Sequence, residues 1–581
     1  MEPEITRRKQ KMKLLWKILI GIFLFIFIIA GIFFTAGYFY YGKLIKTYIL
    51  EYVSRESKGI YTANIDYIYI DFLNGNLTIR GVTLNPDTAR YRKRMAGDTL
   101  SPMLFRVRIR FFKVENFRVM EVFREKKLNI ADIKILEPEI ALFRMQAKTR
   151  ESSEEKKGQR VMSIPLPKGL NSVAIGEILF KKGTFDFYDL TGDSVIHQSI
   201  PSCTISVRNI LVDSLHQGKM RLFNSDDISV VMNELSFRTP DGFNLISLGE
   251  IGLSTAGSTL YVKNFHLIPQ YDRAEYSKRF GWQTDRLDIR VDQLRFDRLD
   301  FRKLLFEGKF IAGRLSVGGL DIDDYRDKRV PRKPGFRPAM PQDGLRNLKR
   351  YLKIDTVVLK NGKATYAEQV GKEPGTIFFN NMNATLTGLT NDSAMLAAGL
   401  VSVLKGTAYM MGKGRMDLDL RFRFGDNRNR FSFSATLGAM DLRLLNPMLT
   451  KLLPAEIISG NSTVMTVPTV SADDDEARGK LICCYTGLKF KVNSGKESTW
   501  NSIKDGVINW VANDLLVNTD NPSKSGKLKT GVIFYRRDKE KGIINFVWKS
   551  VLSGLKSQMG FNSEEQKAMK KKVKNKDEKK K

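Results

Sequence analysis

Apolar and polar residues alternate with a period of two along much of the chain after residue 60. The alternation is clearest in Tyr67–Phe72, Arg106–Phe111, Arg286–Val291, Asp417–Phe424 and Arg430–Leu437. Because successive side chains of a strand point to opposite faces, each segment predicts a β-strand with one apolar and one polar face. The first segment predicts a hairpin with Leu77–Ile79 through a type I′ turn at Asn74-Gly75.

A longer pattern of apolar and turn positions repeats three times without gaps. We interpret the unit as strand, turn, strand, with a bulge where the first apolar step widens from two to three and a turn at the Pro or Gly. The repetition predicts a sheet extended by added hairpins, and ordinary hairpins of an antiparallel domain are the alternative. The copies are Ile130, Ile133, Ile135, Pro138, Ile140 and Leu142; Ile175, Ile178, Phe180, Gly183, Phe185 and Phe187; Ile354, Val357, Leu359, Gly362, Ala364 and Tyr366; with a weaker fourth at Val291, Leu294, Phe296 and Phe301.

Three segments near the two ends of the chain predict helices instead of strands. Ile18–Tyr41 holds twenty-four residues without a charge, and about twenty suffice to cross a bilayer as a helix. Its length and the lack of a good cleavage site favour an uncleaved anchor over a secretory signal. Basic residues before it place the N-terminus in the cytoplasm and the remaining chain outside. Amphipathic helices are predicted around Leu44–Val53, ending at Gly59, and over Ile543–Met559.

Two stretches without strand patterning suggest linkers. Residues 151–160 are charged, and 331–343 are rich in proline, which resists both helix and ladder pairing. The predicted organisation is a cytoplasmic N-terminus (1–17), a transmembrane helix (18–41), an N-terminal helix and β region (42–150), a charged linker (151–160), a central β-repeat region (161–330), a Pro-rich linker (331–343), a C-terminal β-repeat region (344–542), an amphipathic helix (543–560) and a Lys-rich tail (561–581).

The chain is strongly basic, with 95 Lys and Arg against 63 Asp and Glu and a formal net charge of +32. This excess favours contact with anionic lipid headgroups or other polyanions. Three cysteines, Cys203, Cys483 and Cys484, cannot form a disulfide framework in 581 residues.

Candidate catalytic and metal-binding patterns are weak. His197, His216 and His266 show no metal-ligand spacing. Asp473–Glu476 lacks the glycine and spacing of a calcium loop and is better interpreted as a solvated turn. We therefore expect no enzyme activity, no metal, no cofactor and no nucleic-acid binding.

Several stretches resemble the AsmA family of bacterial envelope proteins. Lys43–Leu84 is similar to the N-terminal signature of that family, Leu352–Glu368 and Gly375–Asp392 to its later repeats, and Leu437–Leu449 to its C-terminal part. The terminal stretches resemble a branch found in Bacteroidetes-type bacteria.

The resemblance implies a mainly β fold: a transmembrane helix, then an elongated, twisted antiparallel sheet of repeated hairpins that forms an apolar groove, with short flanking helices. It also implies an inner-membrane protein with a periplasmic body that conducts phospholipid or another lipid towards the outer membrane, with outer-membrane or envelope proteins as further partners. A non-catalytic envelope scaffold with a closed β core is the alternative. The expected groove residues are Ile130, Ile133, Ile135, Ile175, Ile178, Phe180, Phe185, Phe187, Ile354, Val357, Leu359 and Tyr366.

Overall fold

A computed structural model describes residues 42–71, 73–95, 103–145, 169–192, 195–213, 224–452, 455–492, 519–560 and 562–567. These residues form two compact units, and the chain passes from the first to the second between Asn233 and Glu234. The prediction of a mainly β protein is confirmed. Neither predicted linker coincides with the division between the units.

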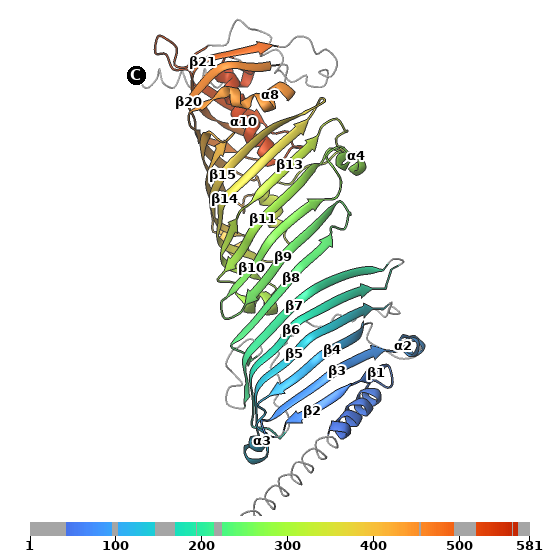
Figure 1. The fold of residues 1–581 in the computed structure, drawn as a ribbon. Coiled ribbons are helices and arrows are strands. Elements are labelled where there is room, and N and C mark those ends of the chain that lie inside the picture. Colours follow the sequence, from blue (N-terminus) through green and yellow to red (C-terminus); the bar gives the residue numbers. More distant parts are fainter. Residues whose placement is uncertain are drawn as a thin grey trace, which may run out of the picture. The chain divides into compact units, whose positions relative to one another are not determined.

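Unit 1 consists of long strands with short helices at their ends (Figure 1). A helix over 42–56 precedes the first strand and ends before Gly59, which has φ +77, as the sequence predicts. The elements that follow are β1 (Tyr61–Asn64), β2 (Tyr67–Asp71), β3 (Asn76–Pro86), α2 (Thr88–Met95), β4 (Met103–Glu115), α3 (Val119–Glu125), β5 (Lys127–Arg144), β6 (Ser172–Asp189), β7 (Ile196–Asp213) and β8 (Asp227–Arg238), of which the last residues already belong to unit 2.

The strands of unit 1 pair mostly with their sequence neighbours. β1 and β2 both lie along β3, and β3, β4 and β5 follow one another antiparallel. β5 and β6 are parallel, after which β7 and β8 continue antiparallel. The sheet is therefore mixed, and the prediction of a purely antiparallel sheet is wrong.

Unit 2 also consists of strands joined by turns and short helices, and it contains more helices than unit 1. Its elements are β9 (Asn244–Ser254), β10 (Thr259–Pro269), α4 (Tyr276–Phe280), β11 (Asp285–Asp297), α5 (Phe301–Glu307), β12 (Phe310–Gly318), β13 (Asp321–Asp327), α6 (Pro341–Arg346), β14 (Leu352–Gln369), β15 (Pro374–Thr390), α7 (Ser393–Ala397), β16 (Ser402–Met410), β17 (Gly414–Phe422), β18 (Phe431–Leu437), β19 (Met440–Asp441), the 3-10 helix η2 (Leu442–Leu445), α8 (Asn446–Leu452), β20 (Ala455–Ala472), β21 (Glu476–Val492), β22 (Gly531–Arg536) and α10 (Ile543–Gln558).

β12 and β13 act as two halves of one strand in unit 2. Both pair antiparallel with β11 and parallel with β14, and Gly319, with φ +64, lies between them. β14 to β18 then follow antiparallel, and β20, β21 and β22 complete the ladder, with β19 as a short extra partner of β20. On the other side β9 and β10 extend the ladder from β11.

The two predicted linkers coincide with the two places where the pairing becomes parallel. A parallel pair needs a long return connection, whereas an antiparallel pair needs only a short turn. Residues 145–171 connect β5 to β6, and residues 328–351 connect β13 to β14. The charged linker 151–160 lies outside the described residues. In the Pro-rich segment Met340 and Gln342 are buried and Pro341 begins α6, so this segment is packed against unit 2 rather than free.

Each of the three gapless repeat copies is a single strand of eighteen residues, so the prediction of a strand-turn-strand unit is wrong. The weaker fourth copy runs from β11 into α5, where Phe301 lies. The first copy lies on β5, the second on β6 and the third on β14. One residue with positive φ precedes the expected turn residue in each case: Glu137, Lys182 and Asn361. A single left-handed residue kinks a strand without ending it.

The predicted N-terminal hairpin is present with a different turn, and the predicted C-terminal helix is present. β2 and β3 form the predicted hairpin, but Asp71 pairs with Asn76, so the connection has four residues and is not the two-residue type I′ turn. The C-terminal helix is confirmed as α10, with Phe546 and Val551 buried. Among the described residues no helix has the length and hydropathy needed to cross a bilayer. The predicted anchor at 18–41 lies outside them.

Candidate functional site

One face of the unit 1 sheet is apolar across six neighbouring strands. In-register partners from β3 to β8 form continuous rows of hydrophobic side chains, because alternation places every second residue on the same face. Nearly all of these side chains are partly exposed. Two rows cross all six strands, Leu77, Val114, Ile133, Ile178, Val207 and Ile228, and Ile79, Phe112, Ile135, Phe180, Ile205 and Val230; a third holds Leu84, Val107, Ile140, Phe185 and Ile200.

Kink residues keep this face continuous along β3, β5 and β6, at Gly81, Glu137 and Lys182. Without a kink, Phe180 and Phe185 would lie on opposite faces, since they are five residues apart. With Lys182 at φ +54, their rings stack with centroids 5.2 Å apart. A Cβ on Gly183 would lie 2.0 Å from the ring of Phe180, which explains why the position after the kink holds glycine.

The opposite face of unit 1 is charged. Cross-strand ion pairs join Arg108 to Glu139 at 2.8 Å and Arg110 to Glu137 at 2.5 Å. His197 lies 2.8 Å from Asp186 on the same face, and Lys134 lies 2.5 Å from Glu115. This hydrogen bond to Glu115 is the main cause of a raised pKa for Lys134. The two faces of the sheet therefore differ in chemistry over the strand segments that carry these ion pairs.

The buried cluster of unit 1 does not involve these apolar rows. It consists of Ile60, Tyr91, Leu104 and Met145, with Phe143 packed against it. Leu104 pairs with Phe143 next to the pair Phe105 and Leu142, so the cluster lies at the strand ends on the other side of the sheet. Burial raises the pKa of Tyr91.

Unit 2 carries a similar apolar face that closes towards its C-terminal strands. One in-register row runs through Leu260, Phe296, Leu315, Val357, Leu386, Leu404, Leu420, Phe433 and Val470. The members on β10 to β16 are partly exposed, whereas Leu420 is 8 % exposed, Phe433 2 % and Val470 0 %. The row passes from an accessible surface into a packed core.

Helices α8 and α10 lie against that core. Phe546 of α10 packs with Phe431 at a ring distance of 6.0 Å, and a Cβ on Gly531 of β22 would lie 2.0 Å from the carbonyl oxygen of Gly554. Met340, from the Pro-rich segment, belongs to the same core. The C-terminal end of unit 2 is therefore a conventional closed β core.

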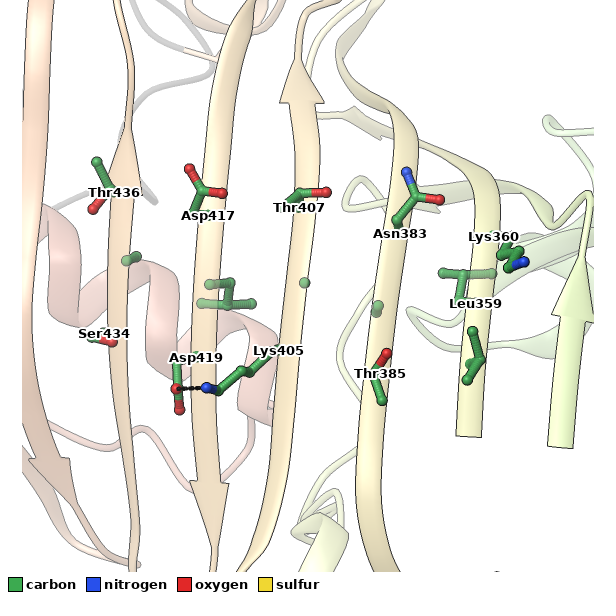
Figure 2. Close-up of a pocket in the computed structure, with 15 residues that line it drawn as sticks. Leu359, Lys360, Asn383, Thr385, Lys405, Thr407, Asp417, Asp419, Ser434 and Thr436 are labelled. Carbon is green, nitrogen blue, oxygen red and sulfur yellow. Dashed lines mark ion pairs between the residues drawn. The ribbon is translucent and has the colours of Figure 1, made fainter. Parts of the chain in front are cut away.

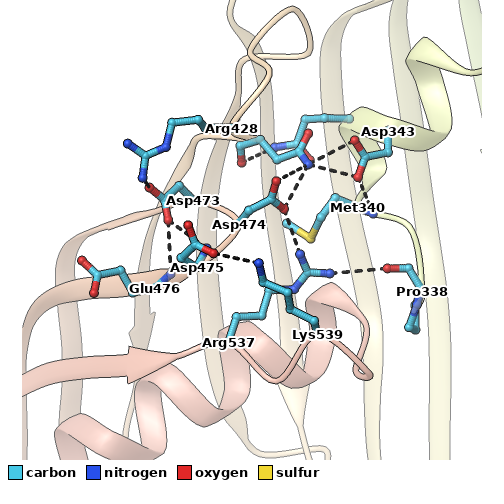
Figure 3. A network of polar contacts seen from close by, with 12 residues as sticks. Pro338, Met340, Asp343, Arg428, Asp473, Asp474, Asp475, Glu476, Arg537 and Lys539 are labelled. Atoms are coloured by element: carbon cyan, nitrogen blue, oxygen red, sulfur yellow. Dashed lines mark hydrogen bonds and ion pairs between the residues drawn. The ribbon is translucent and has the colours of Figure 1, made fainter. Parts of the chain in front are cut away.

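A network of hydrogen bonds and ion pairs links the Pro-rich segment, the β17–β18 and β20–β21 connections and the segment after β22 around this core (Figure 3). The Asn429 amide lies 3.0 or 3.1 Å from the carboxylate oxygens of Asp343 and Asp474. The Arg537 guanidinium, 6 % exposed, is 2.9 Å from Asp474 and donates to the carbonyl oxygen of Pro338 at 3.4 Å.

The acidic residues 473–476 lie at the turn between β20 and β21, and ion pairs connect this turn to the network. Asp473 pairs with Arg428, Asp475 with Lys539 and Glu476 with Arg478. The ion pair with Lys539 is the main reason for the lowered pKa of Asp475. No group of three or more His, Cys, Asp or Glu within the described ranges is arranged to hold a metal ion.

A shallow hollow of about 550 Å³ lies over β14 to β18 (Figure 2). Two rows that are mostly polar flank a middle in-register row of Leu359, Ala384, Gly406, Leu418 and Ala435. Lys405 and Asp419 form an ion pair at 3.9 Å. Its fifteen lining residues include no His or Cys and no paired nucleophile and base, which makes it a poor catalytic site.

In the part of the chain that the structure describes, no arrangement of cysteines or histidines suggests catalytic chemistry. Cys203 and Cys483 are buried, and burial raises the pKa of the Cys483 thiol to about 12. His266 lies 2.9 Å from Asp288, and His216 is outside the described residues.

The twelve expected groove residues lie on β5, β6 and β14. Ile354 is 4 % exposed and belongs to the buried part of unit 2, and the other eleven are partly exposed. β5 and β6 place their copies side by side in register, Ile133 with Ile178 and Ile135 with Phe180. The copy on β14 lies beside β12 and β13 instead, in the other unit.

Sequence reasoning missed most of the apolar row residues outside the repeats. β9 and β10 contribute Ile251 and Val262, and β15 contributes Leu386. The period-two pattern of 244–254 and of 376–389 was a usable signal for these strands.

Comparisons with protein-family models, with curated proteins and with solved structures gave no match to this chain.

Proposed function

We propose that the protein binds and conducts membrane lipid along the apolar faces of its sheets, in support of outer-membrane biogenesis or homeostasis. The observation that carries the proposal is the apolar face of unit 1. It spans six strands, and its side chains are partly exposed, while the buried cluster of the unit lies elsewhere. Soluble proteins rarely leave an apolar surface of this extent uncovered.

Acyl chains suit such a surface physically. Removing apolar area from water contributes about 25 cal/mol per Å², and flexible hydrocarbon can cover rows of Ile, Val and Phe without specific geometry. A face of this kind holds lipid and lets it move along the rows, because dispersion contacts have no fixed register.

The setting of the proposed activity follows from the sequence. An anchor at 18–41 would hold the body next to a lipid source, with the body on the periplasmic side. The resemblance of Lys43–Leu84 and later stretches to the AsmA family supports the same assignment.

A scaffold function is the second candidate, and the closed core of unit 2 favours it. There the apolar row is covered by α8 and α10 in the manner of an ordinary domain. In a scaffold, the partly exposed face of unit 1 would contact protein rather than lipid.

Photo-crosslinking distinguishes the two candidates. Crosslinkers at Ile135, Phe180 and Phe185 should capture phospholipid in cells, whereas crosslinkers at Lys134 and Asp186, on the charged face, should not. Capture of protein alone from the apolar positions would favour the scaffold, and equal lipid capture from both faces would contradict the proposal.

A further inference from the structure

The apolar face of unit 2 ends at a group of charged residues. On β13 the side chains after Ile322 on the same face are Asp324 and Arg326, and Lys328 follows in the same alternation. Across the ladder Asp324 pairs with Leu287 and Tyr366, and Arg326 pairs with Asp285 and Glu368. Hydrophobic side chains and charged side chains therefore adjoin on one surface.

Four cations meet at this border, and we call them the cationic cluster: Arg326, Lys328, Arg332 and Lys541. They come from β13, from the segment after it and from the connection between β22 and α10. The Arg537 contact to Pro338 and the ion pair of Arg332 with Glu540 at 3.9 Å hold that connection against the Pro-rich segment.

Three of the four cations have carboxylate partners. Arg326 makes two bonds of 2.5 Å to Asp285, and Lys328 lies 2.6 Å from Glu368. Their side chains remain 29 % and 31 % exposed, and that of Arg332 is 55 % exposed. These groups therefore keep donors accessible to a ligand.

Lys541 is different. Its ammonium has no carboxylate or hydrogen-bond partner among the residues that the structure describes, although the side chain is half-buried. Burial, together with the smaller effects of the nearby Arg332, Lys328 and Arg326, lowers its pKa to about 8, against an opposing effect of Asp538. A half-buried cation without a partner is costly unless an anion joins it.

We propose that the cationic cluster binds the phosphate group of a phospholipid whose acyl chains lie on the adjoining apolar face. The inference rests on the proposed function and specifies where on the lipid path a headgroup is held. Lys541 supplies the donor without a partner, and the exposed sides of Lys328 and Arg332 complete the contact. Charge-assisted bonds to phosphate oxygens are short and strong. Glu368, which pairs with Lys328 at the same border, limits the net positive charge of the cluster and so favours reversible binding.

The test uses the full-length protein in mixed detergent micelles with radiolabelled dioleoylphosphatidylglycerol or dioleoylglycerol, which differ in the phosphate headgroup. Lys541→Gln should bind the phospholipid about tenfold more weakly, the loss expected for one charge-assisted bond. Its binding of dioleoylglycerol should be unchanged. Lys539→Gln is the matched control, because Lys539 lies two residues away and already pairs with Asp475 at 2.8 Å.

Different failures have different signatures. Equal effects of Lys541→Gln on both lipids, or none on either, would overturn the headgroup site while leaving lipid binding intact. Failure of the unmodified protein to bind either lipid would overturn the proposed function as well. Inorganic phosphate is the third probe, and binding as tight as that of the phospholipid would show a free-phosphate site instead. Arg332→Gln, at an exposed position, should give a smaller loss in the same direction and guards against misfolding of the first variant.

Discussion

Replacing Phe185 with Asp tests whether the apolar face of unit 1 is open. Phe185 lies between Ile140 and Ile200 and stacks on Phe180 at 5.2 Å. Loss of the aromatic pair costs about 1 kcal/mol, and loss of a partly buried ring adds about 1 kcal/mol more. On an open face the new carboxylate stays hydrated, so we expect the free energy of unfolding to fall by only about 2 kcal/mol.

A closed face predicts a much larger effect. There the carboxylate would be buried without a partner, at an added cost of about 3–5 kcal/mol, comparable with the whole stability of many domains. Pulse proteolysis in urea on the full-length protein in detergent measures the difference. Mass spectrometry of co-purifying phospholipid measures whether the apolar face still holds lipid, which we expect Phe185→Asp to abolish.

Leu179→Asp is the matched control for this substitution. Leu179 lies on the same strand but pairs with Lys134 and Ser206 on the charged face. The Leu179→Asp variant should lose a similar amount of stability and still co-purify with phospholipid. A loss of more than about 4 kcal/mol for Phe185→Asp, or retention of normal lipid by that variant, would refute the reasoning.

Two further predictions concern unit 2. Burial, with a smaller contribution from Asp285, raises the pKa of Asp324 to about 7. Between pH 4 and 7 the folded protein therefore holds a proton on Asp324 that the unfolded chain releases. The free energy of unfolding falls as pH rises through that range. Asp324→Asn should remove this slope and stabilise the protein by about 2 kcal/mol at pH 8, allowing for partial exposure, with little change at pH 5, as measured by urea midpoints. Gly531→Ala should loosen α10 from β22, because its Cβ would lie 2.0 Å from the Gly554 carbonyl oxygen; we expect a loss of about 2 kcal/mol and faster amide exchange in α10.

Each of these has a result that would count against it. An unchanged pH slope in Asp324→Asn would mean that another group is responsible for it. Normal exchange protection of α10 in Gly531→Ala would mean that the helix can shift without cost.

Period-two alternation was enough to predict strands, the apolar and charged faces and the mainly β class. It could not show that Glu137 and Lys182 adopt positive φ, because such a conformation in a non-glycine residue depends on the neighbouring strands. For that reason Pro138 and Gly183 looked like turns, although both lie inside long strands.

The parallel pairs were also beyond the sequence pattern. Strand direction depends on how the chain returns, and charge or proline content in 151–160 and 331–343 is compatible with either a linker or a crossover. The cationic cluster was also missed, because Lys541 and Lys328 are more than 200 residues apart in the sequence. Only the packing of the connection before α10 brings them to one surface.

The kinks also define which changes of length this architecture tolerates. Gly81, Glu137 and Lys182 each set the face of the strand half that follows, so deleting one residue beside a kink would exchange inward and outward side chains over that half alone. Insertion of a complete strand with its own kink leaves every existing frame intact. Such a sheet therefore gains or loses length most readily in whole strands.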